Sequence, residues 1–216
     1  MRVDLHCHTC YSPDALTRFD GLLRWMDRRH IHRVAGTDHN TAAGALAFQA
    51  RAPDRIIVGE EILTNAGELL ALFLHETVPP GLTPEESIAR VRAQGGLVGA
   101  SHPLDRARTD AIGAQVLEAL APQLDFVEVF NARAVRRHDN LAALQAARRL
   151  GLPGSAGSDA HSAFEIGRAY VEMPAFDDPA SFLIALAAGQ AHGRESSPLI
   201  HLLSVYARLA KSFGAR

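Results

Sequence analysis

Short apolar segments alternate with longer amphipathic segments along the whole chain. The apolar segments are rich in Val, Ile, Leu and Phe, and they predict β-strands over residues 3–6, 33–39, 55–62, 69–75, 97–102, 126–130, 154–159 and 169–173. The segments between them are rich in Ala, Leu and Arg, and they predict helices over residues 19–30, 41–51, 84–94, 109–120, 136–150, 179–189 and 198–211. Such alternation is typical of parallel strands that are covered by helices.

About seven strand–helix units fit a closed or nearly closed β/α barrel. No Gly/Ser/Pro linker, low-complexity run or clear repeat divides the chain, so we predict one α/β domain over residues 1–216. An open, doubly wound sheet is the alternative. That fold usually has a glycine-rich first turn that binds a nucleotide, whereas the first turn here is rich in histidine.

Composition narrows the possible binding partners. The formal charge is −2, so no overall basic field attracts nucleic acid. Lys211 is the only lysine, and the arginines that make up the other cations suit phosphate because a guanidinium binds two oxygens at once. No segment reaches the roughly 18 apolar residues of a membrane span, and no signal peptide is visible. We therefore expect a cytoplasmic protein with no membrane association and no stable protein partner.

Metal-ligand residue types recur where the predicted strands end. They are His6 and His8, Asp38 and His39, Glu60 and Glu61, His102, and Asp159 and His161. In β/α barrels the carboxyl ends of the strands form one rim, where the loops converge and the chemistry is done. Residues far apart in sequence are therefore expected to meet in one pocket.

The stretch VDLHCHTC permits two kinds of site, His-x-His or Cys-x-x-Cys. Successive side chains of an extended segment point to opposite sides, so His6 and His8 share a face and Cys7 points away. A zinc ribbon needs a second ligand pair, and Cys7 and Cys10 are the only cysteines. A thioredoxin-like pair would open a helix, but residues 11–14 read as a loop. These observations favour the His-x-His metal site.

Five motifs in order, DLHCHTCYSPDA, GTDHN, GEEI, SHP and GSDAH, resemble the polymerase and histidinol phosphatase (PHP) domain over nearly the whole chain. The resemblance implies a distorted (β/α)7 TIM-like barrel, a cluster of usually three divalent metals (Zn, Mn or Fe) and phosphoester hydrolysis. The metal ligands implied by similarity are His6, His8, Asp14, His39, Glu61, His102, Asp159 and His161.

One position departs from the family pattern. Many members have a histidine just before the fourth strand, where this chain has Glu68 in the segment GELLALFL. A carboxylate can replace an imidazole on a hard or borderline metal, so we predict Glu68 as a further ligand. His75 is the alternative, although it lies at the far end of that strand.

Metals assist phosphoester hydrolysis in two ways. They neutralise the phosphate oxygens, and they lower the pKa of bound water from 15.7 towards about 7. Glu61 is the candidate for a carboxylate that bridges two ions. We expect Asp38 to accept a hydrogen bond from a ligand ring or from the substrate, with direct ligation as the alternative. Arg133, Arg168 and Asn131 are the candidates for binding the substrate, since arginine binds phosphate through charged hydrogen bonds.

These observations predict a metal-dependent phosphoesterase. Its substrate would be a small phosphomonoester, or the terminal phosphate of a nucleotide or short oligonucleotide, because the rim loops are short. A histidinol-phosphate-type phosphatase is a narrower alternative. An amidohydrolase-like C–N hydrolase would need a bridging lysine, and Lys211 lies in the last predicted helix. A catalytically silent metal-binding module is the alternative from another class.

Overall fold

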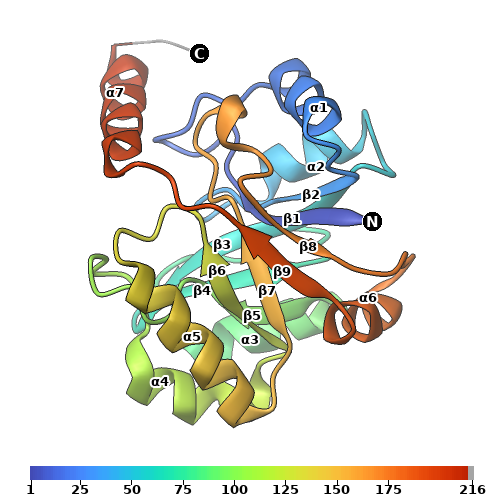
Figure 1. Cartoon of the computed structure of the whole chain (residues 1–216), viewed down its shortest axis with the longest axis vertical. Coiled ribbons are helices and arrows are strands. Elements are labelled where there is room, and N and C mark those ends of the chain that lie inside the picture. Colours follow the sequence, from blue (N-terminus) through green and yellow to red (C-terminus); the bar gives the residue numbers. More distant parts are fainter. Residues whose placement is uncertain (214–216) are drawn as a thin grey trace.

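The computed structural model describes residues 1–213 and contains one nine-stranded sheet in the order β7-β6-β5-β4-β3-β2-β1-β8-β9 (Figure 1). The strands are β1 (Arg2–Cys7), β2 (Arg33–Gly36), β3 (Ile56–Thr64), β4 (Gly67–Leu72), β5 (Leu97–Ala100), β6 (Phe126–Asn131), β7 (Gly154–Gly157), β8 (Ala169–Glu172) and β9 (Gln190–Gly193). The α-helices are α1 (Phe19–Arg28), α2 (Ala43–Gln49), α3 (Pro84–Ala93), α4 (Gly113–Leu120), α5 (Arg137–Leu150), α6 (Pro179–Ala187) and α7 (His201–Ser212). Three short 3-10 helices are η1 (Ala121–Gln123), η2 (Ala163–Glu165) and η3 (Pro198–Ile200).

Strands β1 to β7 form a nearly closed barrel, which confirms the predicted fold class. Most neighbouring strands are parallel, namely β1 with β2, β2 with β3, β5 with β6 and β6 with β7. Strand β4 is antiparallel to both β3 and β5, so the prediction of parallel strands throughout was wrong there. Only residues 65–66 separate β3 from β4, and a parallel crossover needs a dozen or more residues.

The barrel closes through backbone contacts between β1 and the end of β7. The Asp159 amide donates to the His6 carbonyl at 2.8 Å, and the His8 amide donates to the Ala160 carbonyl at 2.9 Å. Gly157 permits this approach, because a Cβ added there would lie 2.2 Å from the Cβ of His6. Strand β8 pairs antiparallel with β1 on the edge opposite β2, and β9, which follows α6 and pairs antiparallel with β8, was not predicted.

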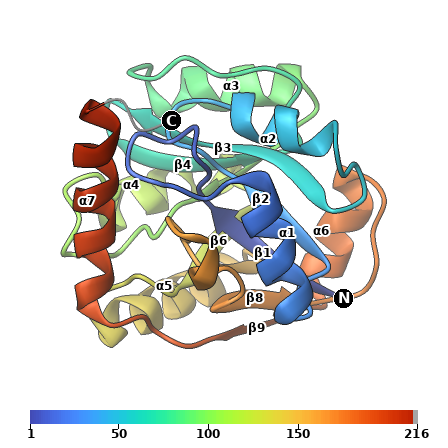
Figure 2. The ribbon, with the colours of Figure 1, turned by 90° about the horizontal axis from the view of Figure 1, so that it is seen from above.

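The helices surround the strands, and α7 stands at one edge of the molecule (Figure 2). Leu5, Leu70 and Phe126 are fully buried and belong to one apolar core cluster that several strands share. Helix α3 begins with the expected cap, since the Thr83 side chain accepts from the Glu86 amide and Pro84 follows. Helix α4 begins later than predicted, at Gly113, and residues 103–112 instead form a loop beside the barrel mouth. None of the helices formed by residues 1–213 combines the length and hydropathy needed to cross a membrane.

Candidate metal centre

All nine predicted ligands lie in one buried network at one mouth of the barrel. His6 lies on β1 and His8 directly after it, and His39 and His102 follow β2 and β5. Glu61 lies within β3 and Glu68 near the start of β4. Asp159 and His161 follow β7, and Asp14 belongs to the loop after β1. In this network only the His39 side chain has appreciable exposure, at 18%.

Glu61 lies at the centre of the network, and each of its oxygens faces a different pair of histidines. Its Oε1 lies 3.3 Å from His6 Nε2 and 2.9 Å from His102 Nε2. Its Oε2 lies 3.3 Å from His8 Nε2 and 3.1 Å from His39 Nδ1. A carboxylate in this position can serve two cations at once, with two imidazoles completing each side.

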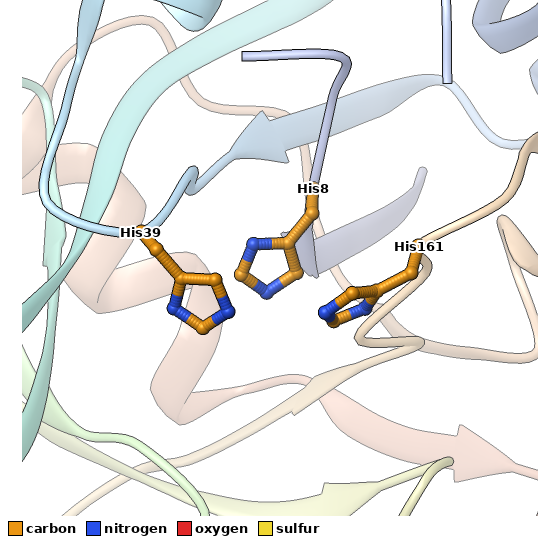
Figure 3. A group of neighbouring side chains, drawn as sticks. All are labelled: His8, His39 and His161. Atoms are coloured by element: carbon orange, nitrogen blue, oxygen red, sulfur yellow. The ribbon is translucent and has the colours of Figure 1, made fainter. Parts of the chain in front are cut away.

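A third group of ligand atoms comes from the loops after β1, β2 and β7. The rings of His8, His39 and His161 turn toward a common space (Figure 3). The centroid of the His8 ring lies 4.4 Å from that of His39 and 4.3 Å from that of His161. Asp14 borders the same space, with its Oδ2 3.5 Å from His161 Nε2.

Glu68 reaches the cluster because β4 runs antiparallel to its neighbours. The start of β4 therefore lies at the mouth where β3 and β5 end. Glu68 Oε1 lies 3.6 Å from His39 Nδ1, and its Oε2 lies 3.6 Å from His102 Nε2. His75, the alternative, follows β4 at the opposite end of the barrel, where it is exposed and its amide donates to Gln94.

Glu128 on β6 belongs to the site but was not among the predicted ligands. Its Oε1 lies 3.0 Å from His6 Nδ1, an arrangement that orients the ring with Nε2 toward Glu61. Its Oε2 accepts from the His102 amide at 2.7 Å and from Asn131 Nδ2 at 3.2 Å. The signal in the sequence was a single carboxylate within the apolar run FVEVF.

Asp38 binds the loop that follows β1. It accepts hydrogen bonds from the hydroxyls of Thr9 and Ser12, each at 2.6 Å, and from the amides of the same two residues at 2.6 and 3.1 Å. The Ser12 hydroxyl in turn lies 3.1 Å from His8 Nδ1. Asp38 therefore holds the loop that orients His8 and makes no direct contact with a histidine ring.

Several buried carboxylate oxygens have no hydrogen-bond partner in the part of the chain that the structure describes. They are Asp14 Oδ1, Glu61 Oε2, Glu68 Oε2 and Asp159 Oδ1. Leaving an ionised oxygen buried without a partner is costly, so these atoms fit a bound cation. Mixed imidazole and carboxylate donors suit Zn, Mn or Fe. The residues present therefore fit a divalent metal centre.

The cluster's electrostatics support the same conclusion. Burial disfavours a charged His8, but the Asp159 and Glu61 carboxylates outweigh it and raise the pKa of His8 to about 9. Burial and the neighbouring Glu61 charge raise the pKa of Glu68. Carboxylates thus outweigh the other charges at this point, and cations would relieve their repulsion.

Two predicted ligands have strained backbones. His102 has φ 25° and Asp159 has φ 52°, in the left-handed region that residues other than glycine rarely adopt. Such strain costs about 1–3 kcal/mol and is concentrated at functional sites. The hydrogen bonds from the His102 amide to Glu128 and from the Asp159 amide to the His6 carbonyl hold both residues in place.

A cavity of about 370 Å³ covers the cluster and is lined by three arginines. Arg108 contacts Asp159 Oδ2, and Arg208 on α7 donates to Asp14 Oδ2 at 2.9 Å. Arg133 is buried and donates to Ser204 Oγ at 2.9 Å. Arg133 was predicted at the site, whereas Arg108 and Arg208 were missed. Nothing in an arginine-rich sequence distinguished these two from surface arginines.

The other predicted substrate-binding residues are placed differently. Asn131 lies in the cluster, where its Nδ2 is 3.3 Å from Asp159 Oδ2. Arg168 is not among the residues that line the cavity. It directly precedes β8, and it lies near Arg29, whose pKa is lowered by burial and by the charge of Arg168. Lys211 contacts the carbonyls of Cys10 and Ser12 and not the carboxylates, so no lysine bridges the cluster.

The fold and the site together define a class, the α/β barrels that carry a histidine–carboxylate cluster at one mouth. Residues 137–191 match the family model described as PHP-associated. Two proteins of Methanocaldococcus jannaschii, both named as uncharacterised, are each 37% identical to this chain. The match to the first covers 61% of this chain and 82% of that relative, and the match to the second covers 80% of this chain and 70% of that relative.

A solved structure shares the fold. It is a two-domain protein from Bacteroides vulgatus that contains a predicted PHP-like metal-dependent phosphoesterase. The superposition has a TM-score of 0.73 at 17% sequence identity and covers 90% of this chain and 65% of that one. This chain belongs to the PHP family, as the motifs predicted.

Proposed function

We propose that the protein is a metal-dependent phosphoesterase that hydrolyses a small phosphomonoester, such as a nucleotide or the end of a short oligonucleotide. The observation that carries the proposal is the position of Glu61, with each oxygen facing a different pair of buried histidines. The PHP-like phosphoesterase in the Bacteroides vulgatus structure supports the same reaction class.

The chain's own residues have separable tasks in this proposal. The nine predicted ligands would hold the cations, Glu61 would serve two of these cations, and Glu128 orients His6. Bound divalent cations supply Lewis acidity and a lowered pKa for water. Asp38, through Ser12, keeps the His8 ring aimed at the centre. We further propose that these cations are Zn, Mn or Fe and that the site holds three of them.

Two arginines are positioned to bind a phosphate beside the cations. Asp159 offers Oδ2 to Arg108, while its Oδ1 has no hydrogen-bond partner. Asp14 offers Oδ2 to Arg208 in the same way, while its Oδ1 also has none. Each carboxylate can therefore give one oxygen to a cation and the other to an arginine. This arrangement brings guanidinium groups to the edge of the metal centre, where a phosphate would lie.

The test combines metal analysis with two chromogenic substrates. Purified protein loaded with Mn²⁺ or Zn²⁺ should hydrolyse p-nitrophenyl phosphate, a monoester, faster than bis-p-nitrophenyl phosphate, a diester. Chelation should abolish the activity and added metal should restore it. Glu61→Gln should lose both metal and activity, since it removes the bridging charge. The matched control is Glu60→Gln, because Glu60 is the neighbouring residue on the same strand but its Oε2 accepts a hydrogen bond from the Val78 amide instead.

The outcomes separate the alternatives. A stoichiometric metal load with no turnover of either compound would favour a metal-binding module without catalysis. Activity that survives complete removal of metal would contradict both functions. Faster hydrolysis of the diester would replace the proposed monoester substrate with a phosphodiester.

A further inference from the structure

A second cavity lies beside the one that covers the metal centre. Its volume is about 600 Å³, and Asp105 and Arg108 line both cavities. Arg108, which contacts Asp159 in the cluster, therefore stands at the boundary between them. When a phosphate binds near Arg108, the group that is esterified to this phosphate can extend into the second cavity.

The walls of the two cavities differ in character. The cavity over the cluster is lined by Arg108, Arg133 and Arg208 together with acids and histidines. The second combines a wall of apolar residues with four charged ones, and the apolar residues are Pro103, Leu104, Ala111, Ala114 and Ala142. Small side chains leave a broad, smooth space, and apolar walls favour a ligand that loses apolar surface to water.

The cations of the second cavity already have partners. Arg106 Nε lies 3.0 Å from Asp139 Oδ1, and Asp139 is itself buried. Arg108 contacts Asp159 and lies 3.5 Å from Asp105. The two arginines and the two aspartates that line this cavity balance in formal charge, so it lacks the excess positive charge that would attract a second phosphate. His138 completes the lining with an exposed ring, on which a flat group can stack.

The local chain path connects this cavity to the metal centre. Residues 103–112 follow the predicted ligand His102 directly and supply most of one wall, while α4 and α5 supply the rest. The loop thus fixes the metal ligand and the cavity wall in one short segment.

We infer that the second cavity receives the alcohol part of the substrate, and that this part carries a flat aromatic or heteroaromatic ring. The inference rests on the proposed function, because it assumes a phosphate on the metal centre. A volume of about 600 Å³ lies within the roughly 300–1,000 Å³ typical of ligand pockets. The substrate class is then a phosphoester of a ring-bearing alcohol, with a nucleoside as one such alcohol.

The test uses two pairs of compounds that differ only in the ring. Benzyl phosphate and n-propyl phosphate report hydrolysis, and benzylphosphonic and propylphosphonic acids, whose C–P bond is not hydrolysed, report binding by calorimetry. Wild-type protein loaded with Mn²⁺ should bind the benzyl compound at least tenfold more tightly than the propyl compound. Ala114→Trp fills the cavity and should remove that preference while leaving propyl binding within twofold of wild type.

Ala119→Trp is the matched control, because Ala119 is also an exposed alanine of α4 but does not line the cavity. It should keep the benzyl preference, and melting temperatures should show that both variants fold. Equal binding of the two phosphonates by wild type, or an unchanged preference in Ala114→Trp, would overturn the inference and leave the proposed function standing. Selective phosphonate binding with no hydrolysis of either phosphate would support the cavity assignment and contradict the proposed function.

Discussion

Replacing Gly157 with alanine should both destabilise the protein and disrupt the metal centre. Gly157 ends β7 at the point where the barrel closes against β1. A Cβ at this position would lie 2.2 Å from the Cβ of His6, 2.8 Å from its amide nitrogen and 2.9 Å from its Cα. Real Cβ atoms essentially never approach other atoms closer than 3.0 Å. Two of the three contacts are with backbone, so no rotation of a side chain relieves them.

The magnitude follows from this geometry. Overpacking a core costs about 1–3 kcal/mol, and a clash with backbone belongs near the upper figure, about 3 kcal/mol. The distance between the new Cβ and the Cβ of His6 must increase from 2.2 Å to at least 3.0 Å. The two strands must therefore move apart, and His6 and Asp159 move with them. A misplacement approaching 1 Å at a catalytic site lowers activity about a hundredfold. We expect a loss of that size in kcat/KM together with weaker metal binding.

The matched control is Gly21→Ala on α1. A Cβ there meets only the Cβ of Ala163 at 3.4 Å, which is ordinary contact, and alanine favours a helix over glycine by about 0.5–1 kcal/mol. Urea denaturation of both variants without metal gives the stability change, and metal titration and kinetics give the rest. If Gly157→Ala kept wild-type metal affinity and kcat/KM, the claim that this junction positions the cluster would be refuted.

Three further predictions concern charge. Arg133→Ala should raise the Michaelis constant about tenfold with little change in kcat, because a charge-assisted hydrogen bond contributes about 1.5–3 kcal/mol; an unchanged constant would remove Arg133 from the substrate site. Burial raises the pKa of Glu60 from 4.5 to about 8, so the folded state keeps a proton that the unfolded state loses, and stability falls as the pH rises through that range. Glu60→Gln should remove about 1.4 kcal/mol per pH unit from that slope in urea titrations of metal-free protein, and equal slopes in both proteins would contradict it. Metal binding should release a proton from His8, whose pKa is about 9, so metal affinity should fall up to about tenfold per pH unit as the pH falls from 8.5 to 6.5; calorimetry that finds no proton release would exclude this.

Local patterns in the sequence were enough to predict where most strands lie and which side chains gather at the mouth of the barrel. The alternation of an extended segment places His6 and His8 on one face, and the structure has both Nε2 atoms facing Glu61. The barrel class was confirmed because strand–helix alternation leaves few other arrangements. Cys7 is buried in the core and both cysteines are free, in agreement with the His-x-His interpretation.

Other features of the site could not be predicted in the same way. The direction of β4, which decides between Glu68 and His75, follows from the short turn at residues 65–66, and this turn was hidden because the predicted strands ended at residue 62 and began again at residue 69. Glu128 lies inside an apolar strand, so periodicity alone marks it as a core position. Arg108 and Arg208 reach the site through a loop and a terminal helix whose placement no local pattern encodes.

The closure of the barrel between β1 and β7 has a consequence for biosynthesis. His6 leaves the ribosome well before Asp159 and His161, which lie more than 150 residues later in the chain. Contacts between such distant segments form late, because the entropy of closing a long loop opposes them. A nascent chain thus lacks the acid and imidazole from β7 that complete the cluster, and it presents only a partial set of donors to metal ions. The complete set of candidate ligands therefore exists only in the finished barrel, after translation has passed β7.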